Sequence, residues 1–480
     1  MANRMLEFTH RSREMPDKRP AAERVGDFHE IYKEFIEEKA QAQASRCSQC
    51  GVPFCSVHCP LHNNIPDWLM LTSQGRLQEA YDVAQETNTF PEVCGRICPQ
   101  DRLCEGMCVI EQSGHGTVTI GAVEKYLTET AWEQGWVKPI EPGPARGQSV
   151  GIVGAGPAGL AAAERLRRLG YGVTVYDRYD RVGGLMIYGI PNFKLDKTVV
   201  ERRTRWLHAS GIRFVLNCDI GRDMAFEDVQ AAHDAVLIAT GVYAAREMAV
   251  PGAGLPGIYP ALDFLTTANR VGLGDRPAHN AQGALNARDR RVIVVGGGDT
   301  AMDCVRTAVR QGAKSVTCLY RRDRINMPGS IREVAHAEEE GVQFRWLEMP
   351  RAALGEDRVE AMRVQPMRLG APDASGRRVP EPCEREDLRL EADMVIKALG
   401  FEPEPLPDLF ALPHLAVSRS ETLRVDRPGM MTNLPGVFAA GDIVRGASLV
   451  VWAIREGRDA AAGIHAYLEA GQARKDPAAA

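Results

Sequence analysis

The chain has 480 residues, of which 44% are hydrophobic and 25% are charged, and its net charge is −5. This length predicts about three domains, and the composition is that of a globular protein with several apolar cores. The slightly acidic balance gives no reason to expect nucleic acid as a partner. Residues 1–20 lack the apolar segment of a secretory signal, and no apolar stretch reaches 18 residues, so we expect a cytoplasmic chain with no membrane partner.

The first 45 residues are expected to be mostly helical. Apolar residues recur here at helical spacing with charged residues between them, which predicts a helix that packs on the rest of the protein. These apolar positions are Phe28, Ile31, Tyr32, Phe35 and Ile36.

Eight of the 12 cysteines follow in two runs of four. The first run is Cys47, Cys50, Cys55 and Cys59, followed by a proline, and the second is Cys94, Cys98, Cys104 and Cys108. Three cysteines followed by a fourth and a proline are a ferredoxin arrangement, in which the fourth cysteine binds the other cluster. The runs therefore predict two [4Fe–4S] clusters with ligands that cross between runs. Structural zinc favours Cys-x2-Cys knuckles, of which only one is present, and disulfides are disfavoured in a chain without an export signal.

Helical patterns surround the second cysteine run. Residues 65–85 and 118–136 both carry an apolar face at helical spacing. A linker composition ends this region at Pro139, Pro142, Gly143, Pro144 and Gly147. The sequence thus predicts a helical iron–sulfur domain before the linker.

A dinucleotide-binding turn begins the next region, between a short buried strand and a helix. Gly154 allows the tight turn, Gly156 lets the backbone approach a pyrophosphate, and Gly159 lets the helix pack on the strand. Pro157 stands just inside the helix start, where its missing N–H costs nothing. A second strand ends in Asp177, about 20 residues beyond the glycines, where a carboxylate accepts hydrogen bonds from a ribose.

A second turn of the same kind follows the strand at residues 291–295. Its residues fit the GxGxxA variant of the fingerprint and are Gly296, Gly298, Asp299, Thr300 and Ala301. The following strand ends in Arg321 and Arg322, with Arg324 close behind, where an NAD-binding unit would carry an acid. Guanidinium groups pair with a 2′-phosphate, so this group predicts a preference for NADPH.

Shorter motifs at the ends of other strands complete the pattern. Two glycines that allow close approach of a cofactor precede a leucine, a small-residue turn ends a buried strand, and a late strand leads to an acid. These residues are Gly183, Gly184, Leu185, Thr240, Gly241, Gly441 and Asp442. A long helix beginning near Ser448 would present a partial positive charge to a phosphate or a reduced flavin.

Together these turns resemble those of the flavoprotein oxidoreductases with two dinucleotide-binding domains. The resemblance implies an α/β fold with two Rossmann-like units, the first for FAD and the second, inserted into it, for NADPH, here preceded by the helical iron–sulfur domain. The expected divisions are 1–145 for the helical domain, 146–249 and 402–480 for the FAD-binding domain, and 250–401 for the NADPH-binding domain. No redox cysteine pair lies beside Gly183 and Gly184, and Cys304 has no CxxC partner, so a dithiol mechanism is not expected.

With both cysteine runs in front, essentially the whole chain is similar to the small (beta) subunits of NADPH-dependent glutamate synthase. It also resembles the N-terminal half of dihydropyrimidine dehydrogenase. Residues 94–99, 103–106 and 183–191 carry this similarity. It implies that hydride passes from NADPH to FAD and that electrons leave singly through [4Fe–4S] clusters. The implied partner is a large (alpha) subunit with FMN that makes L-glutamate from L-glutamine and 2-oxoglutarate.

The ferredoxin-like crossing suggests which residues hold each cluster. Cys47, Cys50, Cys55 and Cys108 would hold one, and Cys59, Cys98 and Cys104 would hold the other. Cys94 could complete the second set, but Glu124 matches a glutamine that is a ligand in dihydropyrimidine dehydrogenase. We favour Glu124, which would leave Cys94 as a small buried residue.

Two other interpretations remain open. The chain could belong to a ferredoxin-linked or electron-bifurcating NADPH oxidoreductase, or it could be a binding subunit with structural clusters. We expect a reductase module that does not hydrolyse glutamine, because Ala2 and not a cysteine follows Met1. No general acid or base is assigned, since the cofactors carry the chemistry.

Overall fold

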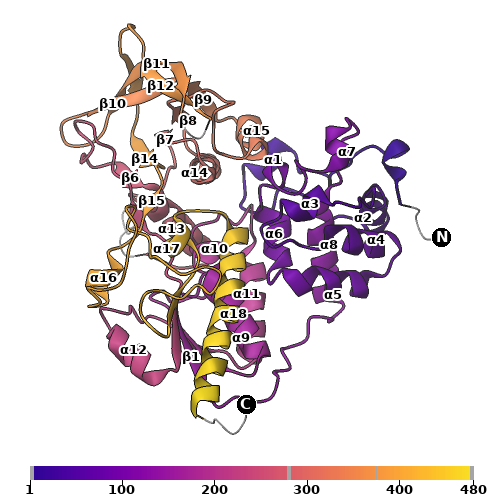
Figure 1. Cartoon of the computed structure of the whole chain (residues 1–480). Coiled ribbons are helices and arrows are strands. Elements are labelled where there is room, and N and C mark those ends of the chain that lie inside the picture. Colours follow the sequence, from indigo (N-terminus) through magenta and orange to yellow (C-terminus); the bar gives the residue numbers. More distant parts are fainter. Residues whose placement is uncertain (1–4, 278–282, 374–375, 476–480) are drawn as a thin grey trace.

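Two five-stranded parallel sheets lie at the centre of the larger part of the molecule, and a group of helices lies beside them (Figure 1). The computed structural model describes residues 5–277, 283–373 and 376–475. Both sheets are α/β units, so the expected fold class is confirmed. Among the described residues, no helix is both long enough and apolar enough to cross a membrane.

Helices and loops, with no strand among the described residues, form the N-terminal part, drawn in indigo and violet (Figure 1). Their apolar faces meet in a core around Trp68, Val123 and Leu127, each completely or almost completely buried. The helices expected over 65–85 and 118–136 are present. The elements are η1 (Glu7–Thr9), α1 (Ala21–Arg24), α2 (Glu37–Ala44), α3 (Phe54–Val57), α4 (Ile65–Ser73), α5 (Leu77–Thr87), α6 (Pro91–Ile97), η2 (Gln100–Arg102), α7 (Val109–Gln112) and α8 (Ile120–Glu133).

The helix expected between Phe28 and Ile36 is wrong. Residues 17–36, called the N-terminal arm below, contain the one-turn helix α1 and otherwise consist of turns and irregular backbone. The arm folds back on itself, with the N–H of Arg19 donating to the carbonyl of Ile31 at 2.9 Å. Its apolar residues have separate distant partners instead of one shared helix face; Phe28, for example, lies against Phe193. Helical spacing therefore arose here without a helix.

The first parallel sheet has the strand order β16-β4-β1-β2-β3. β1 (Ser149–Val153) is central and pairs Val150 with Val173 of β2 (Gly172–Tyr176) on one side and with Ala235 of β4 (Ala235–Ile238) on the other. The long helix α18 (Val450–Lys475) packs along α9 (Pro157–Arg168), as Figure 1 shows. The remaining elements are α10 (Leu185–Tyr188), α11 (Lys197–Ala209), β3 (Arg213–Val215), α12 (Phe226–Ala232), α16 (Leu406–Leu409), β16 (Val437–Ala439) and α17 (Asp442–Arg445).

The second parallel sheet has the order β6-β14-β7-β8-β9, and a separate antiparallel sheet is formed by the strands that follow β9 in the chain. Its apolar strands are buried because helices cover them, as expected for a parallel sheet. Its elements are β6 (Ile258–Pro260), α13 (Ala261–Gly272), β7 (Arg291–Val295), α14 (Asp299–Arg310), β8 (Ser315–Tyr320), α15 (Ile331–Glu339), β9 (Gln343–Trp346) and β14 (Met394–Lys397). The antiparallel strands are β10 (Glu348–Leu354), β11 (Ala361–Pro372), β12 (Arg378–Pro382) and β13 (Leu388–Glu391).

The chain leaves the first sheet and returns to it. β16, far along the sequence, pairs in parallel with β4. The short strands β5 (Ala244–Ala245) and β15 (Phe401–Glu402) pair where the chain passes out and back. The second sheet therefore lies within the sequence of the first, while the domain divisions at 145, 249 and 401 remain predictions. Below, the unit built on the first sheet is called the flavin half, and the unit built on the second sheet is called the nicotinamide half, after the cofactors expected for them.

Candidate functional site

The turn between β1 and α9 has the backbone that its glycines were expected to allow. Gly154 has a φ of +114°, and a Cβ atom there would lie 2.3 Å from the carbonyl oxygen of Ala239. A Cβ atom at Gly159 would lie 2.0 Å from the carbonyl oxygen of Gly154. At Gly156, by contrast, no atom lies within 4 Å of the Cβ position. Gly154 and Gly159 therefore close the turn, and Gly156 leaves open space where a pyrophosphate could approach.

Asp177 holds this turn from the end of the neighbouring strand. Its Oδ2 atom accepts a hydrogen bond from the N–H of Ala155 at 2.7 Å, and Oδ1 accepts one from the N–H of Tyr179 at 2.8 Å. Burial raises the pKa of Asp177, and these two hydrogen bonds oppose the shift. The carboxylate thus fixes the backbone of the glycine turn at the edge of the cavity. The ribose contact expected for it remains a prediction.

One cavity of about 410 Å³ brings the expected flavin residues together. Those that line it are Gly154, Gly156, Pro157, Asp177, Leu185, Thr240, Gly241, Gly441 and Asp442. Gly159, Gly183 and Gly184 do not line it: a Cβ atom at Gly183 would lie 2.7 Å from Val200, and one at Gly184 would lie 2.9 Å from Gly156. These three glycines pack the turn instead of facing the cavity.

Two polar side chains of the cavity wall suit a bound flavin nucleotide. The hydroxyl oxygen of Thr240 is buried and has no hydrogen-bond partner among the described residues. Burial raises the pKa of Asp442 to about 7, although a hydrogen bond from the backbone of Ser448 opposes the shift. Ser448 and Val450 also line the cavity at the start of α18, where free N–H groups favour an anion. The wall therefore fits a cofactor with hydroxyl and phosphate groups.

The turn between β7 and α14 repeats the geometry of the first. Gly296 has a φ of +147°, and a Cβ atom there would lie 2.2 Å from the carbonyl oxygen of Ala398, whereas the Cβ position of Gly298 is open. Ala301 is completely buried under the turn. Asp299 and Thr300 line the same cavity as the flavin residues. Both dinucleotide turns therefore face one space.

The three arginines expected to read the 2′-phosphate have different surroundings. Arg322 is buried, and its guanidinium donates to the carbonyl of Arg378 at 2.8 Å and to Asp373 at 3.3 Å. Arg324 is half-exposed and pairs with Glu338 at 2.7 Å. Arg321 is exposed at the end of β8. Arg321 is thus the one whose guanidinium is open to a ligand.

The eight clustered cysteines are all free thiols and fall into two groups in space. Burial raises the pKa of Cys55 to about 12, and the charges of Cys47 and Cys108 add to the shift. Burial and the charges of Cys108 and Cys50 likewise raise the pKa of Cys47. The first group is therefore Cys47, Cys50, Cys55 and Cys108. The second group is Cys59, Cys94, Cys98 and Cys104, with Glu124 among them.

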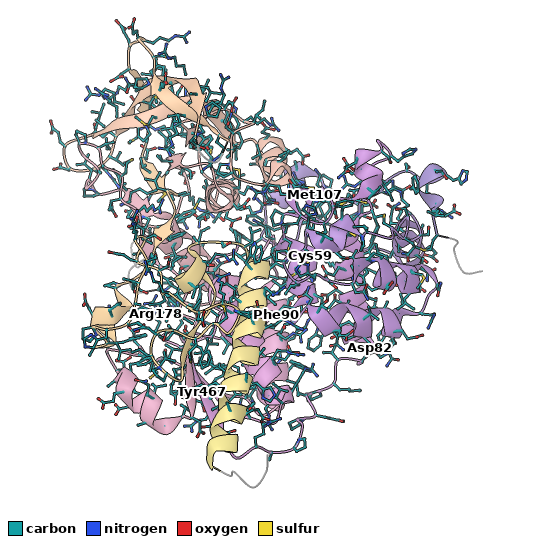
Figure 2. The ribbon with its side chains drawn as sticks, in the orientation of Figure 1. Cys59, Asp82, Phe90, Met107, Arg178 and Tyr467 are labelled. Atoms are coloured by element: carbon teal, nitrogen blue, oxygen red, sulfur yellow. The ribbon has the colours of Figure 1, made fainter. Side chains whose placement is uncertain are left out.

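The second group lies toward the flavin half. Cys59 and Cys98 pack against the core of that half, and Figure 2 shows Cys59 beside the upper part of α18. Among the described side chains, no three from His, Cys, Asp and Glu are arranged for a single metal ion. Each group holds four cysteines, which is the number of thiolates that a [4Fe–4S] cluster takes.

Glu124 and Cys94, the competing ligands, both lie beside Cys98. The Oε1 atom of Glu124 accepts hydrogen bonds from the amides of Asn63 at 3.2 Å and Asn88 at 3.1 Å. Burial raises the pKa of Glu124 to about 8, and both hydrogen bonds oppose the shift. The Sγ atom of Cys94 lies 3.7 Å from the other amide atom of Asn88, its Oδ1. The choice between Glu124 and Cys94 remains open.

Several lining residues could not be found from motifs. Tyr243 lines the cavity with its ring under the guanidinium of Arg178, 4.6 Å from it, and follows the Thr240-Gly241 turn by two residues. Asn63 and Asn88, which hold Glu124, stand in no recognisable spacing. The N-terminal arm also lines the cavity, at residues 30–35. Lys194, which reaches from the flavin half to the nicotinamide half, carried no sequence signal.

Comparison with known proteins places these features in context. Residues 24–136 match the family of dihydropyrimidine dehydrogenase domain II, 4Fe-4S cluster, and residues 148–457 match the pyridine nucleotide-disulphide oxidoreductases. The glutamate synthase (NADPH) small chain of Azospirillum brasilense is 64% identical over 471 residues, covering 98% of each chain. That of Escherichia coli strain K12 is 44% identical over 481 residues, covering 98% of this chain and all of the other.

Two further similarities are to proteins that are not named as glutamate synthase chains. A putative oxidoreductase of Escherichia coli strain K12, AegA, is 45% identical over 469 residues, which cover 94% of this chain and 69% of that protein. Among solved structures, Mycobacterium tuberculosis FprA in complex with NADPH is similar in fold, with a TM-score of 0.57 and 20% identity. The match covers 69% of this chain and 86% of FprA.

Proposed function

The chain belongs to the family of NADPH-dependent glutamate synthase small chains, and we propose from this that it is the electron-input subunit of a glutamate synthase. It is an NADPH-dependent oxidoreductase with FAD and [4Fe–4S] cofactors. Its proposed partner is a large subunit carrying FMN, which makes L-glutamate from L-glutamine and 2-oxoglutarate. The number of clusters in this proposal is two, one for each group of cysteines.

One observation supports the electron path most directly. The cavity of about 410 Å³ is bordered by Gly156 of the flavin turn, Thr300 of the nicotinamide turn and Cys98 of the second cysteine group. When bound, the flavin takes both electrons of a C–H bond from NADPH as hydride and releases them singly to iron–sulfur clusters. All three binding segments therefore face the space where that exchange has to occur.

The residues of the cavity serve to bind and orient. The N-termini of α9 and α14 begin at open glycines, where N–H groups and the helix dipole attract phosphate. Asp177 fixes the first turn, and Thr240 offers an unpartnered hydroxyl. No side chain needs to give or take a proton for hydride transfer itself, so we assign no general acid or base.

The cysteine groups suggest the order of the clusters. Cys98 of the second group lines the cavity, whereas no cysteine of the first group is among its described lining residues. We therefore place the cluster of Cys59, Cys98 and Cys104, completed by Glu124 or Cys94, next to the flavin. The cluster of Cys47, Cys50, Cys55 and Cys108 would then pass electrons to the partner.

A second candidate is suggested by AegA, a putative oxidoreductase that is not named as a glutamate synthase chain. The chain would then supply electrons from NADPH to another acceptor, such as a ferredoxin. The two candidates differ in the partner and not in the input chemistry. Purification of the complex from the native cell distinguishes them.

The experiment has two parts. The isolated chain should hold one FAD and about eight iron and eight sulfide per chain, and should reduce artificial acceptors with NADPH without making glutamate. Addition of the large subunit should then produce glutamate from glutamine and 2-oxoglutarate. Stoichiometric zinc with little iron, or glutamate made by the isolated chain, would contradict the proposal.

A further inference from the structure

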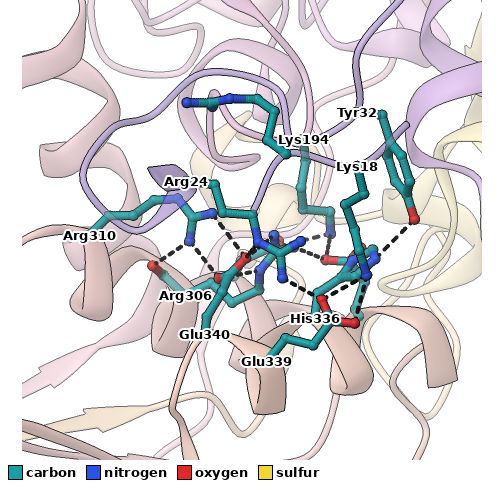
Figure 3. A network of polar contacts seen from close by, with 12 residues as sticks. Lys18, Arg24, Tyr32, Lys194, Arg306, Arg310, His336, Glu339 and Glu340 are labelled. Atoms are coloured by element: carbon teal, nitrogen blue, oxygen red, sulfur yellow. Dashed lines mark hydrogen bonds and ion pairs between the residues drawn. The ribbon is translucent and has the colours of Figure 1, made fainter. Parts of the chain in front are cut away.

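The segment from Asn192 to Leu195 of the flavin half meets both other parts of the molecule at one point. The amide of Asn192 donates to the carbonyl of Phe28 in the N-terminal arm at 2.9 Å. The ring of Phe193 lies under the guanidinium groups of Arg306 and Arg310 on α14, at 4.5 Å and 3.9 Å. Lys194 reaches into the same group of charges (Figure 3). This short segment is therefore a junction of three parts of the chain.

Lys194 makes the polar contact of this junction with the nicotinamide half. Its Nζ atom lies 2.8 Å from Oδ1 of Asp303 on α14 and 3.6 Å from Oε2 of Glu333 on α15. The three side chains are only 13%, 10% and 14% exposed. Burial alone would lower the pKa of Lys194, but the charges of Asp303 and Glu333 outweigh it and raise the pKa, so the ammonium stays charged.

Further ion pairs and hydrogen bonds hold the residues that surround Lys194 in this junction. Arg306 donates to Glu333 at 2.6 Å and to both oxygens of Glu340 at 2.9 Å. The arm adds Arg24, 3.0 Å from Glu340, and Tyr32, whose hydroxyl lies 3.0 Å from Nε2 of His336. A charge held in this way has little freedom to move, because its partners are themselves hydrogen-bonded on buried surfaces.

The position of Asp303 connects the junction to the cofactor site. It lies in α14 one turn beyond Asp299 and Thr300, at the start of the helix whose N-terminus faces the cavity. Lys194, Asp303 and Glu333 also line that cavity. The ion pair thus ties the nicotinamide turn to the segment that follows the flavin glycines.

We propose that Lys194 is a positioning residue for hydride transfer, and that its ion pair with Asp303 fixes the nicotinamide half against the flavin half. The assignment rests on the proposed path from NADPH to flavin. Hydride transfer needs the reacting atoms about 3–3.5 Å apart, and a displacement of about 1 Å can cost roughly a hundredfold in rate. Because the chain passes between the two halves only where it leaves and re-enters the first sheet, a contact beside the cavity would fix their relative position. Lys194 itself exchanges neither a proton nor an electron.

The test compares three variants of the full chain loaded with its cofactors. Lys194→Met removes the charge at similar length, Lys194→Arg keeps it, and Lys18→Met is the matched control. Lys18 forms an ion pair with Glu339 at 2.6 Å beside the same junction, but it lies outside the cavity and is about a third exposed. Stopped-flow absorbance gives the limiting rate of flavin reduction, calorimetry gives the affinity for NADP⁺, and hydrogen exchange reports the mobility of α14.

We expect Lys194→Met to lower the limiting rate of flavin reduction by about tenfold to a hundredfold, with the affinity for NADP⁺ roughly unchanged. Lys194→Arg should regain most of the rate, and Lys18→Met should match the unaltered protein. Hydrogen exchange in α14 should rise in Lys194→Met alone. If Lys194→Met fails to hold flavin, Asp303→Asn, which is isosteric, should show the same slow reduction with unchanged affinity.

Each of the following outcomes would overturn the assignment. They are an unaltered limiting rate in Lys194→Met or in Asp303→Asn, an equal loss in Lys194→Met and Lys18→Met, and no gain in Lys194→Arg. A lost affinity for NADP⁺ that accounts for the whole effect would show a binding role instead. An unaltered protein whose flavin is not reduced by NADPH would overturn the proposed function, and this assignment with it.

Discussion

Arg203 and Glu92, 111 residues apart, form a buried ion pair with two hydrogen bonds, from Nε to Oε1 at 2.6 Å and from Nη2 to Oε2 at 2.8 Å. Arg203 belongs to α11 of the flavin half and Glu92 to α6 of the helical part. The guanidinium also lies over the rings of Trp132 and Trp206, 5.2 Å and 4.8 Å from their centres. The cluster-bearing part is thus held to the flavin half by a paired charge enclosed in aromatic side chains.

Glu92→Ala should therefore destabilise the contact between these two parts. It leaves a buried guanidinium without its partner, which costs about 3–5 kcal/mol. Thermal unfolding, monitored through the release of flavin, should show a lower midpoint temperature for this variant. Glu79→Ala removes a glutamate from an exposed ion pair with Arg76 and should leave the midpoint unchanged. Equal midpoints for the two variants would show that the buried pair does not hold the parts together.

Arg321→Ala should raise the KM for NADPH by about tenfold or more and leave that for NADH nearly unchanged, because each charge-assisted phosphate contact contributes about 1.5–3 kcal/mol. Arg322→Ala breaks hydrogen bonds within the nicotinamide half, so its effect should be similar for both cofactors. Arg324→Ala breaks an ion pair with Glu338 and tests the third arginine expected to contact the 2′-phosphate. Steady-state kinetics with both cofactors measure all three. Equal losses for Arg321→Ala would point to a structural role there.

Glu124→Ala should remove or alter the cluster next to the flavin, while Cys94→Ser should retain it. An oxygen ligand also changes the charge at the iron, so the electron paramagnetic resonance spectrum should shift when Glu124 is replaced. Iron content and the spectra of the two variants give the comparison. If Cys94→Ser loses a cluster and Glu124→Ala keeps both unchanged, four cysteines hold that cluster.

Glu340 should make the stability of the nicotinamide half depend on acid pH. Burial would raise its pKa, but hydrogen bonds from Arg310 and Arg306 outweigh burial and lower the pKa to about 2. A carboxyl with a depressed pKa stabilises the fold above its unfolded pKa, and the contribution is lost as the pH falls through the folded value. The free energy of unfolding should be about 3 kcal/mol lower for Glu340→Gln than for the unaltered protein near pH 7, and this difference should shrink below about pH 4.5. A difference that does not vary with pH would contradict this.

The two dinucleotide turns could be predicted because their signals are local. A strand, a glycine that must have positive φ and a helix start lie within about ten residues, and Gly154 and Gly296 meet this requirement through their own neighbours. The arm could not be predicted in this way. Its apolar residues contact Phe193 and His336, more than a hundred residues away, and their spacing along the chain carries no trace of these partners.

The same limit applies inside the site. The cysteine runs predicted clusters because thiols at such short spacing have few other uses. The asparagines that hydrogen-bond to Glu124 could not be predicted, because they come from two different loops. Lys194 and Asp303 are ordinary charged residues until the two halves are brought together. Motifs located the binding segments, and only the tertiary arrangement revealed what aligns them.

The contacts of the N-terminal arm also determine the order in which parts of the protein can assemble during synthesis. Lys18 leaves the ribosome early, but its partner Glu339 follows 321 residues later. At about 5–20 residues per second, this ion pair forms no sooner than roughly 15 to 60 seconds after Lys18 is made. The arm meets the flavin half earlier, because Asn192 follows its partner Phe28 by 164 residues. The wall that residues 30–35 contribute to the cavity is therefore closed against α15 only after the nicotinamide half has been made.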